Sequence, residues 1–397
     1  MSSFTCKKYS NTLFYISVLC CDETSGENMY KIMLLSFVVG CFVFWRVILP
    51  IKGWWKWIAA FPLGLAALKF PIIRLIGGPN LFAPAIPGWV ILTGGWLYAA
   101  MIVFFFGLLL HELIRGPVLV KKSESFRKKW DSCAHCVLLV FTVIFVSIGV
   151  YNAIPVPRVI NYKVKIKNLP KEASGLRIAV LADLHADWLT GKKRISGMVQ
   201  RAMEQKADII AIVGDFVDGK VERIAEEVSP LGELKAKYGV YGVPGNHEYY
   251  SKYLPWKKEF ERRGITMLDN KNVVLPCNIA VAGVTDRAAR KYELPLPDVK
   301  KAVAGIDESM PVILLAHRPE LALEAAENRV ALQVSGHTHG GMAPILKYFV
   351  ARANYGFVSG RYKVKDTTLI VSNGSGIWNG FPVRIGVPAE IVVITLE

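Results

Sequence analysis

The stretch VSGHTHGG, residues 334–341, holds two of the seven histidines in this chain of 397 residues. His337 and His339 are separated by one threonine and are enclosed by three glycines. A His-x-His spacing places both side chains on the same side of an extended segment. Glycines on both sides have no side chain, so another group can approach the backbone closely there. The stretch therefore predicts a binding site rather than two packed, structural histidines.

Five apolar runs, this one included, end on side chains that commonly bind metal ions. Each run is typical of a strand buried on both faces, and each stops on a polar residue where its loop begins. The runs are RIAVLADLH (177–185), DIIAIVGDFVDG (208–219), YGVYGVPGNHEYY (238–250), PVILLAHRPE (311–320) and ALQVSGHTHGG (331–341). Because sites in sheets with helical crossovers form at the carboxyl ends of the strands, we expect these ends to meet.

The five ends supply two carboxylates, an amide oxygen and four imidazoles. The side chains are Asp183, His185, Asp215, Asn246, His317, His337 and His339. These are too many ligands for one ion, and they suit two borderline divalent ions that share a carboxylate at roughly 3.5–4 Å separation. Asp218 fits a loop cap or a residue that supports the ligands better than a ligand. A single histidine is commonly structural, so the prediction rests on the whole set.

The series DLH, GD, GNHE, AHRPE and GHTHGG resembles the calcineurin-like metallophosphoesterase superfamily. Within it, the chain is most similar to the branch of transmembrane proteins with a metallophosphoesterase domain. YGFVSGRY (355–362) and the C-terminal SNGSGIWNGFPVRIGVPAEIVVITLE resemble that branch too, so the likeness covers about residues 160–397. One departure is Met342, because the family commonly has glutamine after HTHGG. This change affects the pocket wall and no ligand.

The resemblance implies an α/β fold, an αββα sandwich of two packed sheets with helices outside. It also implies two divalent ions (Mn, Fe or Zn), the first bound by Asp183, His185 and His339. The second would be bound by Asn246, His317 and His337, with Asp215 bridging the two. A bridging water would attack phosphorus in line, and the ions would neutralise the charge growing on the phosphoryl oxygens. His247 would be no ligand; it would lie near the phosphate as the leaving-group acid or a transition-state stabiliser.

Residues 1–155 differ in composition from the rest. Hydrophobic residues make up 52% of the chain, its mean hydropathy is +0.33, and most long apolar runs lie in this half. A bilayer span takes about 20 residues, and the candidates are 30–49, 55–76, 88–110 and 132–154. We expect the second span to be kinked or re-entrant, because it is interrupted by Pro62, Lys69, Pro71 and Arg74.

The sequence thus predicts three parts. Residues 1–28 form a leader without a convincing cleavage site, and Met29 is an alternative start. An all-α transmembrane region of about four helices follows at 29–155, and a metallophosphoesterase domain occupies 156–397. NYKVKIKNLP (161–170) alternates apolar and basic residues, so we expect a half-exposed edge strand near the start of that domain.

The formal net charge of +16 is shared evenly by the two halves. Residues 1–155 carry 14 basic and 6 acidic side chains, and the rest carries 34 and 26. The second half has no basic stripe with interleaved aromatics, so we expect contact with anionic membrane lipid and no nucleic-acid partner. Six basic residues precede the last span, namely Arg115, Lys121, Lys122, Arg127, Lys128 and Lys129.

These six basic residues favour a cytoplasmic loop. The basic cluster between Arg158 and Lys171 favours the opposite orientation, but large domains translocate largely regardless of charge. We therefore expect a multi-pass cell-membrane protein whose catalytic domain lies outside the cytoplasm. The sequence gives no indication of its oligomeric state.

The cysteines predict no further site. Only Cys277 lies in the second half, so that half forms no internal disulfide. Cys133, His135 and Cys136 resemble a short metal motif, but a haem pattern would need histidine where Val137 stands. The trio also opens an apolar span, so we predict no metal ion there.

The leading hypothesis is a membrane-anchored phosphohydrolase for a phosphorylated small molecule or a lipid-linked substrate. Some relatives are similar to pyrophosphatases that cleave UDP-2,3-diacylglucosamine, but that substrate lies on the cytoplasmic face, in conflict with the expected orientation. A catalytically silent membrane receptor or scaffold with the same fold is the alternative. The complete ligand set weighs against it, because silent members would be expected to lose ligands.

Overall fold

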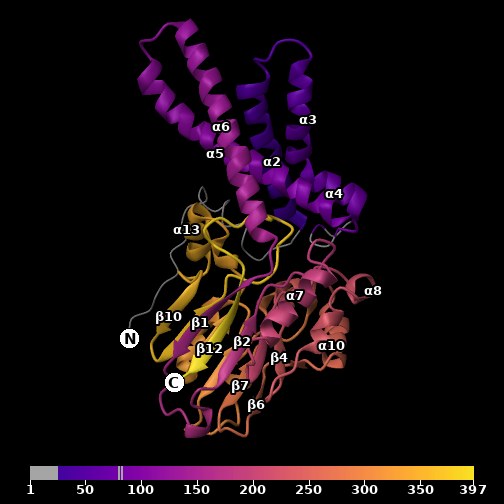
Figure 1. Ribbon diagram of the computed structural model, residues 1–397, viewed down its shortest axis with the longest axis vertical. Coiled ribbons are helices and arrows are strands. Elements are labelled where there is room, and N and C mark those ends of the chain that lie inside the picture. The colour runs from indigo at the N-terminus through magenta and orange to yellow at the C-terminus, as the bar shows by residue number, and fades with distance from the viewer. Residues whose placement is uncertain (1–25, 79–80, 82–83) are drawn as a thin grey trace.

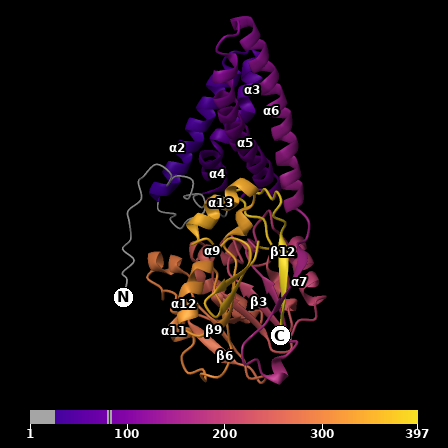
Figure 2. The same cartoon turned by 90° about the vertical axis from the view of Figure 1, so that its left-hand side faces the viewer.

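The computed structural model describes residues 26–78, 81 and 84–397, so most of the predicted leader lies outside the described residues. A helical region comes first in the chain and a two-sheet sandwich follows (Figure 1). The first part consists of α2 (Gly26–Val43), the π-helical turn η1 (Phe44–Ile48), α3 (Trp55–Ala67), α4 (Lys69–Gly77), α5 (Gly88–Leu119) and α6 (Glu124–Ala153). Figures 1 and 2 both show these helices stacked on one end of the sandwich.

Three segments of this region are long and apolar enough to cross a membrane: Tyr30–Ile48, α5 and α6. The pair α3 and α4 passes the same test together but is bent by 68°. The bend lies at Leu68 because Pro71 has no N–H to donate to the carbonyl four residues before it, yet fits the first turn of a new helix. The expected kink in the second stretch is confirmed.

Ion pairs join the helices at the end away from the sandwich. Arg46 lies 2.6 Å from Glu112 of α5 and 3.3 Å from Asp131 of α6. Arg115 adds a second contact to Asp131 at 2.9 Å. A carboxylate shared by two guanidinium groups holds three helical segments together where the basic loop begins.

The cysteine and histidine trio on α6 does not converge. Cys133 and Cys136 are exposed free thiols. The His135 ring instead contacts His111 of α5, with 5.3 Å between the ring centroids. The contact packs α6 against α5.

Two sheets of six strands form the sandwich. The first has the order β1 (Arg158–Val164), β12 (Glu390–Leu396), β2 (Arg177–Leu181), β3 (Ile209–Val213), β4 (Val240–Val243), β5 (Thr266–Met267). The second has the order β10 (Gly360–Val364), β11 (Thr367–Val371), β9 (Val330–Ser335), β8 (Val312–Leu315), β7 (Ala280–Gly283), β6 (Lys271–Val274). The predicted edge strand is β1, which stands first in its sheet and pairs with β12. It spans Arg158–Val164, so it begins three residues before the predicted stretch 161–170 and ends six residues earlier.

Helices cover the outer faces of both sheets. They are α7 (Lys192–Met203), α8 (Val221–Ile224), α9 (Asn246–Tyr250), α10 (Tyr253–Arg262), α11 (Val299–Ala302) and α12 (Ala322–Glu327). Helix α13 (Pro344–Ala353) lies instead at the end of the sandwich next to the helical region (Figures 1 and 2). Short 3-10 turns lie between the elements: η2 (Lys171–Ala173), η3 (Ser229–Glu233), η4 (Arg287–Tyr292), η5 (Pro319–Leu321) and η6 (His339–Gly341).

The apolar core has three layers. Side chains such as Val180 and Val334 fill the space between the sheets. Trp256 of α10 packs in a cluster with Leu181 on one outer face, and α11 and α12 pack on the other. Helix, sheet, sheet and helix therefore follow one another, and the predicted αββα sandwich is confirmed.

The helical region and the sandwich meet through a C-terminal loop, residues 377–385. Buried Lys69, at the start of α4, donates to the backbone carbonyl of Gly380 at 3.0 Å. Phe381 packs in a cluster with Tyr98 and Met101 of α5. Because a backbone carbonyl and an aromatic ring of the loop are held by membrane-type helices, the two parts of the chain share an interface close to β12.

Candidate metal centre

The seven predicted ligands come from five strands that belong to two different sheets. β2, β3 and β4 are parallel neighbours in the first sheet, and β8 and β9 are parallel neighbours in the second. Each ligand follows the carboxyl end of its strand by a few residues. Packing the sheets face to face brings these ends together at one edge of the sandwich.

Left-handed backbone conformations direct most of these side chains. The positive φ angles are 51° at Asp183, 46° at His185, 51° at Asp215, 72° at His337 and 47° at His339. Such angles cost free energy in residues with a Cβ, and they persist only where the surroundings impose them. Their concentration at three of the five strand ends, those of β2, β3 and β9, is typical of a functional site.

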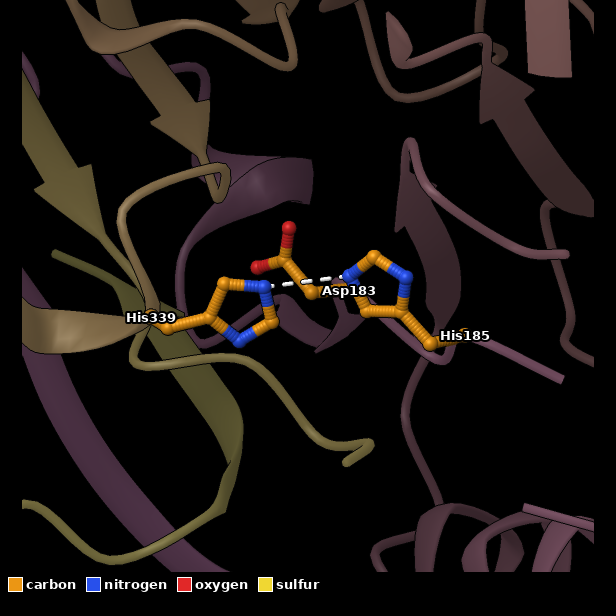
Figure 3. A group of neighbouring side chains, drawn as sticks. All are labelled: Asp183, His185 and His339. Carbon is orange, nitrogen blue, oxygen red and sulfur yellow. Dashed lines mark hydrogen bonds between the residues drawn. The ribbon is translucent and has the colours of Figure 1, made fainter. Parts of the chain in front are cut away.

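The first group consists of Asp183, His185 and His339 (Figure 3). One ligand atom from each residue lies within 4.8 Å of the others. The Nε2 atoms of His185 and His339 are 3.0 Å apart. Asp183 also accepts a hydrogen bond from the backbone N–H of His337 at 2.9 Å, which ties the loop after β2 to the loop after β9.

The second group consists of Asp215, His317 and His337. Nε2 of His317 lies 3.2 Å from Asp215 Oδ2 and 3.2 Å from His337 Nδ1. Asn246 is linked to this group by Arg318, which donates to Asn246 Oδ1 at 3.3 Å and contacts His337 Nε2 at 2.8 Å.

Asp215 stands between the two groups. Its Oδ2 is 3.7 Å from His185 Nε2 and 4.0 Å from His247 Nε2, in addition to its contact with His317. His185, Asp215 and His247 accordingly form a third group of close ligand atoms. A carboxylate in this position can serve ions on both sides.

The chemistry of the donors fits divalent cations. In each facing pair of imidazoles, two nitrogen atoms meet at hydrogen-bond distance, and both rings have lone pairs to offer. Borderline divalent metals take imidazole nitrogen and carboxylate oxygen together. The imidazole and carboxylate groups of this site therefore suit divalent metal ions.

The two imidazoles of each facing pair, His185 with His339 and His317 with His337, have different electrostatic surroundings. Burial lowers the pKa of His317, but Asp215 outweighs it and raises that pKa to about 10. Burial and Arg318 hold the pKa of His337 well below its usual range. Burial and His185 do the same to the pKa of His339. His185 has a raised pKa, because Asp218 outweighs its burial. Within each facing pair, the pKa of one ring is therefore raised and that of the other is lowered.

Two glycines make room for the ligands. A Cβ on Gly214 would lie 2.4 Å from His317 Nδ1, and one on Gly336 would lie 2.6 Å from Asp183 Oδ2. Gly214 also has a φ of +84°, which glycine adopts freely. The glycines were expected to let another group approach closely, and the groups that approach Gly214 and Gly336 are His317 and Asp183.

Asp218 lies behind the ligands and holds two imidazoles. Its carboxylate is 3.1 Å from Nδ1 of His185 and 2.5 Å from Nδ1 of His247. Each ring donates from Nδ1 and turns Nε2 toward the centre of the site. The pKa of His247 is raised to about 9, since Asp218 and Asp215 outweigh the effect of burial.

Sequence reasoning missed two supporting residues. Glu248 accepts hydrogen bonds from the backbone N–H groups of Asp215 at 2.9 Å and Gly245 at 2.7 Å, which joins the loops after β3 and β4. Arg318 is held by Asp286 at 2.7 Å while it contacts the second group. The signals were present as the glutamate of GNHE and the arginine of AHRPE.

Known proteins resemble the chain in both parts. Residues 176–341 match the family model described as calcineurin-like phosphoesterase. A Danio rerio protein named transmembrane protein with metallophosphoesterase domain is 32% identical over 327 residues, which cover 78% of this chain and 74% of that protein. A Helicobacter pylori protein named uncharacterized metallophosphoesterase is 32% identical over 339 residues, or 84% of this chain and 87% of that protein.

Both alignments are longer than the segment from residue 156 to the C-terminal end, so they extend into the helical region. The fold, the grouped ligands and these similarities define a metallophosphoesterase with apolar helices long enough to cross a membrane. The chain belongs to the calcineurin-like phosphoesterase family.

Proposed function

We propose that this chain is a multi-pass membrane phosphohydrolase with two divalent metal ions. The convergence of the Asp183 group and the Asp215 group, with Asp215 Oδ2 between them, is the observation that carries the proposal. Asp183, His185 and His339 would hold one ion, and Asn246, His317 and His337 the other. Asp215 would serve both. Mn, Fe and Zn all suit this mixture of nitrogen and oxygen ligands.

Bound ions supply a water of lowered pKa and neutralise the charge that develops on the phosphoryl oxygens. Other side chains of the protein orient the residues that would hold the ions. Asp218 fixes the orientation of His185 and His247 through their Nδ1 atoms. Arg318 fixes Asn246 and His337 from outside the second group. These contacts hold the ligands in one geometry before a substrate arrives.

His247 is the proposed general acid. Its Nδ1 is occupied by Asp218, and its Nε2 faces the same space as Asp215 Oδ2. The surrounding carboxylates favour the protonated ring, so Nε2 carries a proton that can pass to the leaving oxygen of a phosphoester. His247 is not needed as a ligand in the proposed two-ion site, because it belongs to neither the first nor the second group.

The proposed substrate is a phosphorylated small molecule or a lipid-linked phosphoester or pyrophosphate such as UDP-2,3-diacylglucosamine. A membrane location favours the lipid-linked class. The test is to purify the full-length protein in nanodiscs with Mn, Fe or Zn and measure hydrolysis of monoesters, diesters and nucleotide-lipid pyrophosphates. Turnover of at least one class is expected, and no turnover of any class with any of these metals would contradict an enzymatic role.

The catalytic domain is predicted to lie outside the cytoplasm. The basis is the basic segment 115–129, which covers the end of α5, the short loop after it and the start of α6, since such segments stay in the cytoplasm. Alkaline phosphatase and a fluorescent protein, each fused to the C-terminus in a bacterial host, report the two sides of the membrane. We expect phosphatase activity and little fluorescence. Fluorescence without phosphatase activity would place the domain in the cytoplasm and favour a cytoplasmic nucleotide-lipid substrate.

A further inference from the structure

The glycine-rich loop SNGSG, residues 372–376, follows β11 and runs beside the first group of proposed ligands. The backbone N–H of Gly376 donates to the carbonyl of Asp183 at 2.8 Å. A Cβ on Gly374 would lie 2.9 Å from side-chain atoms of Asp183. The loop therefore packs directly against a residue whose positive φ its surroundings must impose.

The guanidinium group of buried Arg384 binds the same loop. It donates to the backbone carbonyls of Asn373 at 2.8 Å and Gly376 at 3.1 Å. Its Nη2 also lies 3.4 Å from Nδ1 of His339. Because a guanidinium group has five N–H donors in a fixed plane, it can bind several acceptors at once. Arg384 thus contacts His339 directly and reaches Asp183 through the loop.

Arg384 is itself anchored to the helical region. Its backbone N–H donates to the carbonyl of Gly149 in α6 at 2.9 Å. A Cβ on Gly149 would lie 2.5 Å from Val383 and 2.9 Å from Ile385, so the chain on both sides of Arg384 is in close contact with α6. Figure 2 shows α6 descending from the far end of the helical region to the sandwich. The position of Arg384 therefore depends on a helix that is long and apolar enough to cross a membrane.

A second arginine joins the same two parts of the molecule. Arg194, in the first turn of α7, donates to the carbonyl of Pro155, just after α6, at 2.7 Å. It also donates to the carbonyl of Ser375 in the loop at 3.2 Å. The loop 372–376 is therefore linked to the C-terminal end of α6 by Arg194 as well as by Arg384.

We propose that Arg384 is a positioning residue for the first group of ligands and that α6 holds it in place. Through the loop 372–376 and its contact with His339, it keeps Asp183 and His339 in the geometry that a metal ion needs. This inference rests on the proposed two-ion phosphohydrolase function. It goes beyond that function by making a helix of the helical region part of the support of the metal centre.

Titration of the metal-free, full-length protein in nanodiscs with Mn²⁺, followed by calorimetry, tests the role of Arg384. In Arg384→Ala, we expect the affinity for one of the two ions to fall by roughly 10–100-fold, as loss of a residue that supports a ligand predicts. The affinity for the other ion should stay close to the wild-type value, because Arg318 supports the second group.

Three results would count against this role. Unchanged binding of both ions in folded Arg384→Ala would overturn the proposal, and so would an equal loss of affinity for both ions. Failure of the wild-type protein to bind two ions would instead reject the two-ion centre, and this inference with it. The failure of the inference is therefore distinguishable from the failure of the proposed function.

Chemical rescue separates positioning from a general loss of structure. Arg384→Ala leaves a space with the shape of a guanidinium group, so millimolar guanidinium chloride should restore the lost affinity for Mn²⁺. This concentration is far below the molar range that unfolds proteins. Sodium chloride at the same ionic strength should restore nothing. A loss that guanidinium does not reverse would assign Arg384 a general structural role and contradict the proposal.

Two glycine variants test the anchor on α6. Gly149→Ala adds a Cβ that would lie 2.5 Å from Val383, so it displaces the chain next to Arg384. Gly94→Ala in α5 is the matched control, because a Cβ there would meet no atom of the described residues within 4 Å outside its own helix. We expect Gly149→Ala to weaken the binding of the same ion as Arg384→Ala, and Gly94→Ala to bind both ions like the wild type. Wild-type binding by Gly149→Ala would contradict the anchoring by α6.

Discussion

Asp215→Asn is expected to abolish turnover and to release metal from both sites at once. Asp215 Oδ2 lies 3.2 Å from His317 Nε2 in one group and 3.7 Å from His185 Nε2 in the other. The amide keeps the shape of the side chain but removes the anionic charge that both ions would share. The loss should exceed the roughly 10–100-fold that removal of a residue supporting a ligand costs. Activity and metal content of the purified variant measure it.

The control for this variant is Asp366→Asn. Asp366 is exposed in the turn between β10 and β11, so the same change of charge there should leave activity and metal content as in the wild type. Circular dichroism of both variants checks that the fold is retained. If folded Asp215→Asn protein kept two ions and most of its activity, Asp215 would not be the shared ligand.

His247→Gln should lower the rate by roughly 10²–10⁴-fold, which is what a positioned general acid contributes. Metal content should stay close to the wild-type value, because the first and second groups are complete without His247. Glutamine retains a polar side chain of similar length but does not transfer a proton to the leaving oxygen. Metal analysis and kinetics on one preparation separate the two roles.

The leaving group distinguishes a proton donor from a charge stabiliser. p-Nitrophenol departs with little need of protonation, so the loss in His247→Gln should be small for p-nitrophenyl esters. An alkyl phosphodiester has a far more basic leaving oxygen, and its loss should remain large. Equal losses for both substrates would make His247 a charge stabiliser. Metal loss as severe as in Asp215→Asn would make it a ligand.

The positions that meet at the candidate site could be predicted because the sequence marks them locally. An apolar run such as 209–213 predicts a buried strand, and the polar residue after it predicts a strand end, whichever sheet the strand joins. The sequence does not tell which strands pair. The division of the five strands between two sheets depends on contacts distant in the chain, and only the family resemblance indicated a sandwich.

Contacts between residues that lie far apart in the sequence could not be predicted in the same way. Asp218 was expected as a supporting residue, but its contacts with both His185 and His247 depend on how two loops meet. Arg384 lies 45 residues after His339 and follows no recognisable spacing. Its Nη2 lies 3.4 Å from Nδ1 of His339, because the C-terminal loop meets the metal centre only in the folded chain.

The number of metal ions per folded chain tests the central claim most directly. The full-length protein is purified in nanodiscs, stripped of metal, saturated with Mn, Fe or Zn, freed of excess metal and measured by elemental analysis against protein concentration. The account predicts two ions per chain in the wild type, because the first and second groups lie on either side of Asp215 Oδ2. A stoichiometry of one or fewer at saturating metal would contradict it.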